Sequence, residues 1–282
     1  MTATLPPPPA PPPPAPPGPA PAVRPPSPGA RRAWRVVGAL LAVLALGWGT
    51  LQVVVLLAHS ERSFERVLTG DVGEVRVSID AGSLRIVATD GPEVRVSARV
   101  SDGLVSTDHR EEVEGSAVVL ESSCPPVLST FCSIDYVVEV PRSVSVRIRT
   151  ETAPVTVTGT RGSLDVGTDT GAIRLIDTDG DVVARTDTGA VTLDDVVAAR
   201  TDVRTDIGSV TASYLEDPRS VVVRTDTGSV EIVLPDADTT YRLEADSGNG
   251  SVTTPVRTDP DAQRSVDVRS DVGSITVTYA SR

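Results

Sequence analysis

The sequence predicts an all-β fold, a two-sheet β-solenoid preceded by one transmembrane helix. Three observations lead to this prediction: a repeat of 18–20 residues, alternation of apolar and polar residues inside each repeat, and a single long apolar segment near the N-terminus. Apolar residues make up 39% of the 282 residues and aromatic residues only 3%, so Val, Ile, Leu and Ala must build the core. Val and Ile are β-branched and favour strands.

Residues 1–35 are predicted to be a disordered, proline-rich cytoplasmic tail. The run from Pro6 to Pro28 is mostly Pro and Ala. Proline lacks a backbone N–H and fixes φ, so this run can form neither a helix interior nor a sheet ladder. Two interpretations stay open, a spacer and a docking site for a proline-recognising domain.

Residues 36–58 are predicted to form a transmembrane helix that acts as a signal-anchor. Only Thr50 and Gln52 interrupt the apolar stretch from Val36 to Ala58, which is long enough to cross a bilayer core of about 30 Å. Four arginines precede it: Arg24, Arg31, Arg32 and Arg35. The positive-inside rule therefore predicts a single-pass protein of the cell membrane, with a cytoplasmic N-terminus and an extracytoplasmic C-terminal domain.

The alternative for this segment is a cleaved signal peptide, because Ala58-His59-Ser60 resembles a small-x-small cleavage site. Apolar cores of signal peptides are about 7–15 residues long, and this stretch is longer. The length favours the anchor.

Residues 60–143 are predicted to be an irregular β region that caps the repeats, with a separate module as the alternative. Alternating stretches such as Glu74–Ile79 and Val94–Val100 are divided by Gly-containing turns. Cys124 and Cys132 are the two cysteines of the chain, and outside the cytoplasm we expect them to form a disulfide.

Residues 144–282 contain the repeat. Thr-Asp-Thr-Gly occurs at Thr168–Gly171, Thr186–Gly189 and Thr225–Gly228, and an outlying copy reads Asp80-Ala81-Gly82. Each repeat reads as strand, Asp/Gly turn, strand and second turn. The predicted turn residues are Asp169, Gly171, Asp187, Gly189, Asp206, Gly208, Asp226, Gly228, Asp271 and Gly273. Stacking of the repeats would bury their Val columns, which predicts a β-solenoid; the alternative is an antiparallel β-sandwich.

Asp-Thr-Gly also occurs in the active site of aspartic peptidases, where two carboxylates face each other and share a proton. Here the triplet recurs at the repeat spacing, so its carboxylates would stack in one column. The turn explains every copy, and we predict no catalytic residues and no cofactor.

Stacked carboxylates could bind calcium, or neighbouring arginines could neutralise them. An arginine stands two residues before the acid in five repeats, at Arg149, Arg185, Arg204, Arg224 and Arg269. We therefore predict an Arg/Asp ladder and no metal site. The formal net charge of −12 argues against nucleic-acid binding, which needs a basic surface.

The Thr-Asp-Thr-Gly-Ala/Ser-Val/Ile copies resemble a bacterial family of membrane-anchored β-strand-repeat proteins labelled "putative adhesins", over about residues 70–280. The resemblance implies a solenoid-like fold and a location at the cell surface. The first functional hypothesis is a non-catalytic, adhesin-like interaction module for a protein or glycan at the cell surface. The alternative is an envelope-stress sensing scaffold that recruits a cytoplasmic partner through its proline-rich tail.

Overall fold

The chain divides into two units with the boundary between Val53 and Val54. The computed structural model describes residues 28–57, 60–102, 106–124, 132–235 and 238–280. Most of the proline-rich tail therefore lies outside the described residues. Helix α1 spans Pro28–Leu57 and exposes a run of apolar side chains that includes Leu44 and Trp48. Within the described part of the chain, no helical segment combines the length and apolar character that a membrane crossing requires.

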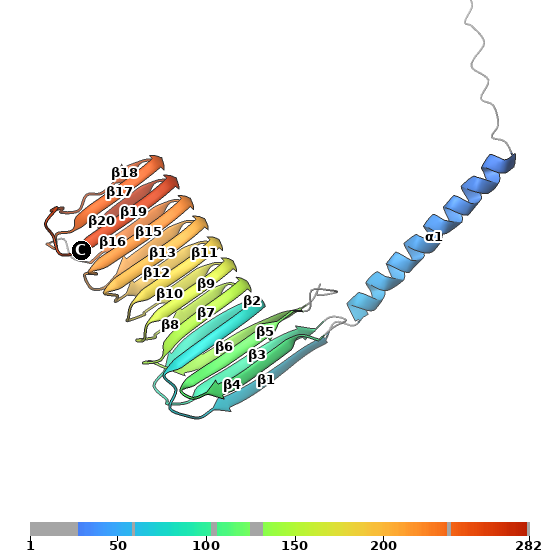
Figure 1. Ribbon diagram of the computed structural model, residues 1–282, viewed down its shortest axis with the longest axis horizontal. Coiled ribbons are helices and arrows are strands. Elements are labelled where there is room, and N and C mark those ends of the chain that lie inside the picture. Colours follow the sequence, from blue (N-terminus) through green and yellow to red (C-terminus); the bar gives the residue numbers. More distant parts are fainter. Residues whose placement is uncertain (1–27, 58–59, 103–105, 125–131, 236–237, 281–282) are drawn as a thin grey trace, which may run out of the picture. The chain divides into compact units, whose positions relative to one another are not determined.

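The second unit is built from strands (Figure 1). Their bounds are β1 Ser60–Leu68, β2 Glu74–Thr89, β3 Val94–Asp102, β4 Asp108–Glu114, β5 Ala117–Ser123, β6 Ser133–Pro141, β7 Ser145–Thr152, β8 Val155–Thr158, β9 Leu164–Thr170, β10 Ile173–Ile176, β11 Val182–Thr188, β12 Val191–Val196, β13 Arg200–Ile207, β14 Val210–Tyr214, β15 Ser220–Thr227, β16 Val230–Leu234, β17 Arg242–Asn249, β18 Val252–Thr253, β19 Ser265–Val272 and β20 Ile275–Tyr279.

Successive strands alternate between two parallel ladders, which we call sheet A and sheet B. Sheet B contains β7, β9, β11, β13, β15, β19 and β17, and sheet A contains β8, β10, β12, β14, β16, β20 and β18. One strand of sheet B, a tight turn and one strand of sheet A form a rung. Rungs pair in register, as in Thr186↔Thr205 and Thr205↔Thr225. The predicted β-solenoid is confirmed, and the parallel pairing excludes the antiparallel sandwich for the repeats.

Residues 60–143 contribute regular rungs as well as an end structure. Strand β2 bends across both sheets, so the outlying copy at Asp80-Ala81-Gly82 is the corner of a rung that pairs with β7 and β8. Strands β5 and β6 form the next rung outward. Beyond it, β3 pairs antiparallel with β6, β1 with β3, and β4 with β5. Antiparallel strands thus close this end of the solenoid.

The rungs at the C-terminal end do not follow the order of the sequence. Strands β19 and β20 insert between the rung of β15 and β16 and the rung of β17 and β18 (Figure 1). The inward side chains explain this order. Strands β19 and β20 contribute Val266, Val268, Ile275 and Val277, whereas β17 and the two-residue β18 contribute Leu243, Ala245 and Val252. The rung with the weaker apolar stripe lies at the exposed end, where less apolar surface is left in water.

The core is a stack of aliphatic columns between the two sheets. Inward positions of every inner rung are almost completely buried, for example Val203, Val210 and Val223 at 0% exposure. Outward positions alternate with them along each strand, as the burial pattern of β13 shows. This alternation follows from the two-residue period of a strand. The aliphatic core agrees with the composition, which has many Val residues and few aromatic ones.

Glycine is required at the corner because consecutive rungs approach closely there. A Cβ atom added at Gly189 would lie 1.9 Å from the carbonyl oxygen of Gly171, and one at Gly208 would lie 1.8 Å from that of Gly189. A glycine in a turn usually suggests a different reason, a positive φ. Gly82 and Gly273 have positive φ, but Gly171, Gly189 and Gly208 do not. At those three positions the absence of a side chain is what the corner needs.

The first threonine of Thr-Asp-Thr-Gly joins neighbouring rungs. Its side chain is buried, and its hydroxyl donates to the corner carbonyl of the preceding rung. The bonds are Thr168 to Ala153 (3.3 Å), Thr186 to Gly171 (3.2 Å), Thr205 to Gly189 (3.2 Å), Thr225 to Gly208 (3.2 Å) and Ser270 to Gly228 (3.0 Å). Each bond satisfies a polar group that the tight corner would otherwise bury without a partner.

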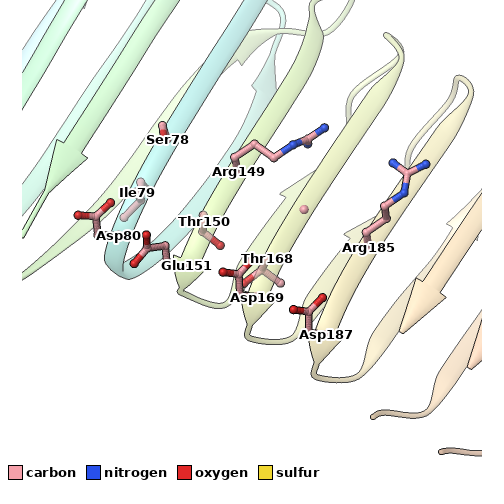
Figure 2. Close-up of a pocket in the computed structure, with 11 residues that line it drawn as sticks. Ser78, Ile79, Asp80, Arg149, Thr150, Glu151, Thr168, Asp169, Arg185 and Asp187 are labelled. Carbon is pink, nitrogen blue, oxygen red and sulfur yellow. The ribbon is translucent and has the colours of Figure 1, made fainter. Parts of the chain in front are cut away.

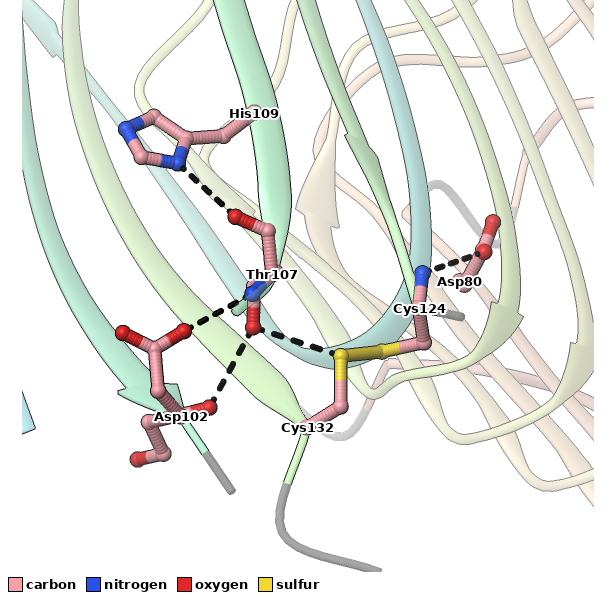
Figure 3. The surroundings of a disulfide bond; sticks show 7 residues. Asp80, Asp102, Thr107, His109, Cys124 and Cys132 are labelled. Carbon is pink, nitrogen blue, oxygen red and sulfur yellow. Dashed lines mark hydrogen bonds between the residues drawn. A yellow bond between two sulfur atoms is a disulfide. The ribbon is translucent and has the colours of Figure 1, made fainter. Parts of the chain in front are cut away.

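The predicted disulfide between Cys124 and Cys132 is present, with its Cα atoms 5.8 Å apart. It joins the end of β5 to the start of β6, at the place where inner rungs have a glycine corner (Figure 3). The Cys124 N–H donates to Asp80 of the next rung at 2.8 Å, and the Thr107 hydroxyl lies 3.3 Å from the Cys132 sulfur. The disulfide therefore closes the outermost corner and connects it to the neighbouring rung.

Replacement of Gly208 by alanine tests the close approach at the corner. The new methyl group would overlap the Gly189 carbonyl, so we expect a loss of about 1–3 kcal/mol or more of unfolding free energy by thermal or denaturant unfolding. Gly91→Ala is the matched control, because its Cβ would meet nothing closer than 3.9 Å. Equal stability of the two variants would contradict this account of the corner.

Replacement of Thr205 by valine tests the hydroxyl bond without changing the shape of the side chain. The change removes the donor to Gly189 from a site that is 2% exposed, and we expect a loss of about 1–3 kcal/mol in unfolding free energy. The control is Thr211→Val on an exposed strand position. The hydroxyl bond contributes nothing if Thr205→Val melts with the wild-type protein.

Candidate functional site

The outward surface of sheet B carries two straight columns of charge near its corner, which we call the charged face. One column contains Arg149, Arg185, Arg204, Arg224 and Arg269. The other contains Asp80, Glu151, Asp169, Asp187, Asp206, Asp226 and Asp271. In-register pairing of the rungs stacks each column at the strand spacing of about 4.8 Å. The solenoid thus converts a motif repeated in sequence into a linear array on one surface.

The arginines do not pair with the turn acids, so the predicted Arg/Asp ladder is wrong in its partners. They turn the other way, toward acids that lie one outward position earlier in the strands. Arg149 binds Asp165 at 2.9 Å, Arg204 contacts Asp202 at 3.3 Å, and Arg224 and Arg269 both contact Asp267 at 3.4 Å. Arg185 is only within 3.9 Å of Asp165 and 4.0 Å of Asp202. A guanidinium therefore reaches along the strand and not into the turn.

Asp165 lies at the most extensively paired point of this array. Partial burial acts to raise the pKa of its carboxyl group, but hydrogen bonds and charge from Arg149 and Arg147 outweigh this and hold the pKa below its ordinary value. The neighbouring arginines therefore stabilise the ionised form of Asp165. It serves as an anchor for the arginine column and offers no proton for acid–base chemistry near neutral pH.

The turn acids have no ion pair in the described part of the chain, and six of the seven are exposed. Asp80 is the half-buried one and accepts the bond from the Cys124 N–H. The carboxylates lie one above another in a single column, so neighbouring rungs present no facing pair of the kind an aspartic peptidase needs. Among the described residues, no group of three or more His, Cys, Asp or Glu side chains is placed to hold a metal ion.

An open hollow of about 330 Å³ interrupts the charged face where the arginine column has a glycine, Gly167 (Figure 2). Arg149 and Arg185 flank it on the strands, while Glu151, Asp169 and Asp187 border it at the turns. The Arg149 side chain lies across Gly167, its Cδ 3.2 Å from where a Cβ would stand. Both charge columns therefore face the same open surface.

The outward surface of sheet A is different in chemistry. Its positions carry mainly hydroxyl side chains, for example Thr156, Thr192 and Thr211, with isolated charges at Arg174 and Glu231. These positions stack in register in the same way as those of sheet B. The molecule thus has one charged and one hydroxyl-rich broad face, and only the former has two opposed columns of charge.

The sequence predicted where the turn residues lie along each repeat but missed the acids that bind the arginines. Asp165, Asp202 and Asp267 are separated by different intervals and alternate with Val183 and Val222 in the same column. A signal was available, because in each case an acid stands two residues before the arginine position in its own repeat. The proline-rich stretch that could recruit a cytoplasmic partner lies in residues 1–27, outside the described residues.

Comparison with known proteins finds one family model that matches the repeats. The family model described as Toastrack DUF4097 matches residues 143–278. No curated protein is detectably similar in sequence. Solved structures that resemble the chain include a "putative cell adhesion protein" from Clostridium sporogenes, 13% identical with a TM-score of 0.40, covering 78% of this chain and 100% of that one. A "putative adhesin" from Bacteroides fragilis is 10% identical with a TM-score of 0.45, covering 78% and 98%. Residues 143–278 of this chain are therefore similar to the Toastrack DUF4097 family.

Proposed function

We propose that the protein is a membrane-anchored, extracytoplasmic interaction module without catalytic activity, and that it binds its partner through the charged face. The observation that carries the proposal is the column of turn acids, which are exposed and form no ion pair in the described part of the chain. Charges left without partners on a rigid surface are available to a binding partner. Such arrays contribute specificity and association rate more than raw affinity.

The shape of the charged face suits a flat or extended partner, such as a protein surface or a glycan. Small-molecule sites are usually concave and mostly apolar. The hollow at Gly167 is lined by charged and hydroxyl side chains, with Ile79 as its only large aliphatic side chain. A partner that spans several rungs would meet the same pair of charges at each one, so its binding strength would grow with the number of rungs it covers.

The arrangement of the carboxylates supports a non-catalytic role. Acid–base catalysis needs groups whose environments drive their pKa values apart and that converge on one point. The turn acids are equivalent positions in successive rungs and stand side by side in solvent. Asp165 is held ionised by its arginines. Neither set brings a donor and an acceptor together around a substrate.

The anchor is proposed from the sequence. Only Thr50 and Gln52 interrupt the apolar segment 36–58. Arginines precede it, and few positive charges follow, which favours a cytoplasmic N-terminus and an extracytoplasmic strand domain. Extraction of cell membranes with carbonate tests the anchor: the full chain should stay with the membrane pellet, and release into the supernatant would contradict it.

Neutralising the acid column tests the interaction surface. We expect full-length protein carrying Asp187→Asn, Asp206→Asn and Asp226→Asn to be retained on isolated cell envelopes at least about tenfold more weakly than wild type, because three charged contacts of about 0.5 kcal/mol each would be lost. Retention of the wild type should fall with salt.

The matched control neutralises Arg174→Gln and Glu231→Gln on sheet A, which should leave retention unchanged. Equal retention of the acid-column variant and the wild type, with both shown folded by circular dichroism, would remove the charged face from the proposal.

A further inference from the structure

The two charge columns are coupled rung by rung. In five rungs the arginine and the turn acid stand two residues apart, and both side chains lie outward on sheet B. The pairs are Arg149 with Glu151, Arg185 with Asp187, Arg204 with Asp206, Arg224 with Asp226, and Arg269 with Asp271. The middle residue of each triplet points inward and is buried. Every such rung therefore presents one positive and one negative group at the same height along the solenoid.

Contacts within the chain leave both the arginines and the turn acids able to contact a partner. The arginines bind acids on the side away from the turn, yet their side chains remain 41–55% exposed. The turn acids lie on the opposite side of the arginine column and are exposed. Residues of both columns line the hollow at Gly167, so both columns are open to solvent there (Figure 2). The charged face thus consists of parallel positive and negative stripes, each with free capacity for a further contact.

We propose that the partner of the charged face is a second copy of this chain. A two-fold axis parallel to the solenoid axis, between the two stripes, would place the arginine column of each copy against the turn-acid column of the other. Such a rotation leaves heights along the solenoid unchanged, so Arg185 meets the Asp187 position of the second copy and each rung makes two equivalent pairs. The interface is isologous, as in most homodimers.

Other face-to-face symmetries lack this complementarity. A two-fold axis parallel to the strands would lay each column against itself, so that arginine opposes arginine and aspartate opposes aspartate. Like charges opposed across a contact are destabilising. The charge pattern therefore selects the parallel arrangement, in which the solenoids of both copies run in the same direction.

The orientation has a consequence for the protein on its membrane. This inference rests on the proposed anchor and the proposed use of the charged face. With the solenoids parallel, the ends that carry β1 lie on the same side of the dimer. Since β1 follows the apolar segment in the chain, both copies can be anchored in one membrane. The geometry selects association between neighbours in the same membrane and opposes bridging between two membranes.

The strength of the contact should depend steeply on salt. A single exposed ion pair contributes little, but five rungs on each copy supply ten pairs that act together. The Debye length falls from about 10 Å at 0.1 M salt to about 3 Å at 1 M, so high salt should screen the array. We expect dimerisation of the full chain in detergent to weaken at least about tenfold between these salt concentrations, as measured by light scattering coupled to size exclusion.

Charge reversal provides the decisive test. One variant carries Arg185→Glu, Arg204→Glu and Arg224→Glu, and the other carries Asp187→Arg, Asp206→Arg and Asp226→Arg. Each variant alone would oppose like charges across the two-fold axis and should be monomeric. Mixed together, the two variants present acidic stripes to basic stripes at the altered rungs and should form a heterodimer. Arg174→Glu with Glu231→Arg on sheet A is the control, and it should dimerise like the wild type.

The outcomes separate this inference from the function on which it rests. A monomeric wild type at low salt, a dimer that persists in either variant, or a mixture of folded variants that stays monomeric would each overturn the dimer. If the arginine variant fails to fold, Asp187→Asn, Asp206→Asn and Asp226→Asn supply the second test, because these acids bind nothing in the described chain; an unweakened dimer in that variant would also refute the proposal. Charge-dependent retention on envelopes with no self-association would leave the interaction module standing and remove the second copy as its partner.

Discussion

The spacing of backbone against backbone at the corner of each rung is the constraint on which this structure depends. The corner glycine of one rung lies so close to the corner carbonyl of the preceding rung that no side chain fits between them. The buried threonine hydroxyl then occupies the remaining donor position on that carbonyl. Together they fix one rung directly above another at the strand spacing. A rung displaced by one residue would place a side chain where only hydrogen fits, so the register is specified at the corner as well as by the apolar columns.

The two columns of charge are a direct consequence of this register. When equivalent positions stack, a residue repeated in sequence becomes a stripe in space, and any charge at that position is brought next to its own kind. The stacked arginines reduce the repulsion between their like charges by binding acids nearer the start of the strands. The turn acids have no such relief within the described chain. Their repulsion is tolerable because they are exposed, where water and salt screen them. Repulsion among the turn acids therefore destabilises the fold little, and the acid column stays available for contacts outside the chain.

Much of this architecture could be read from the sequence because its signals are local and repeated. The period of the glycines, the alternation of Val with polar residues, and the presence of two cysteines, Cys124 and Cys132, each predicted what the structure shows. The failures concern choices between competing neighbours. Whether Arg204 binds Asp202 or Asp206 depends on the direction of a long side chain, because both acids stand two residues away. The insertion of β19 before β17 depends on which rung exposes less apolar surface at the end, and that is a property of the whole stack.

The corner glycines show how a constraint between neighbouring repeats escapes an interpretation based on one repeat. A glycine in a turn usually suggests a positive φ, and at Gly273 the backbone does adopt one. At Gly189 and Gly208 the constraint comes from the neighbouring rung, which a single repeat cannot reveal. Constraints that arise between repeats are invisible in any one copy, and the same holds for the charged face. One Arg-Thr-Asp triplet is an ordinary exposed strand end, whereas stacked copies of it make two opposed stripes long enough to recognise a surface of matching pattern. In such a fold the whole array of rungs carries the binding function. A change in one rung should therefore weaken binding only in part and not abolish it.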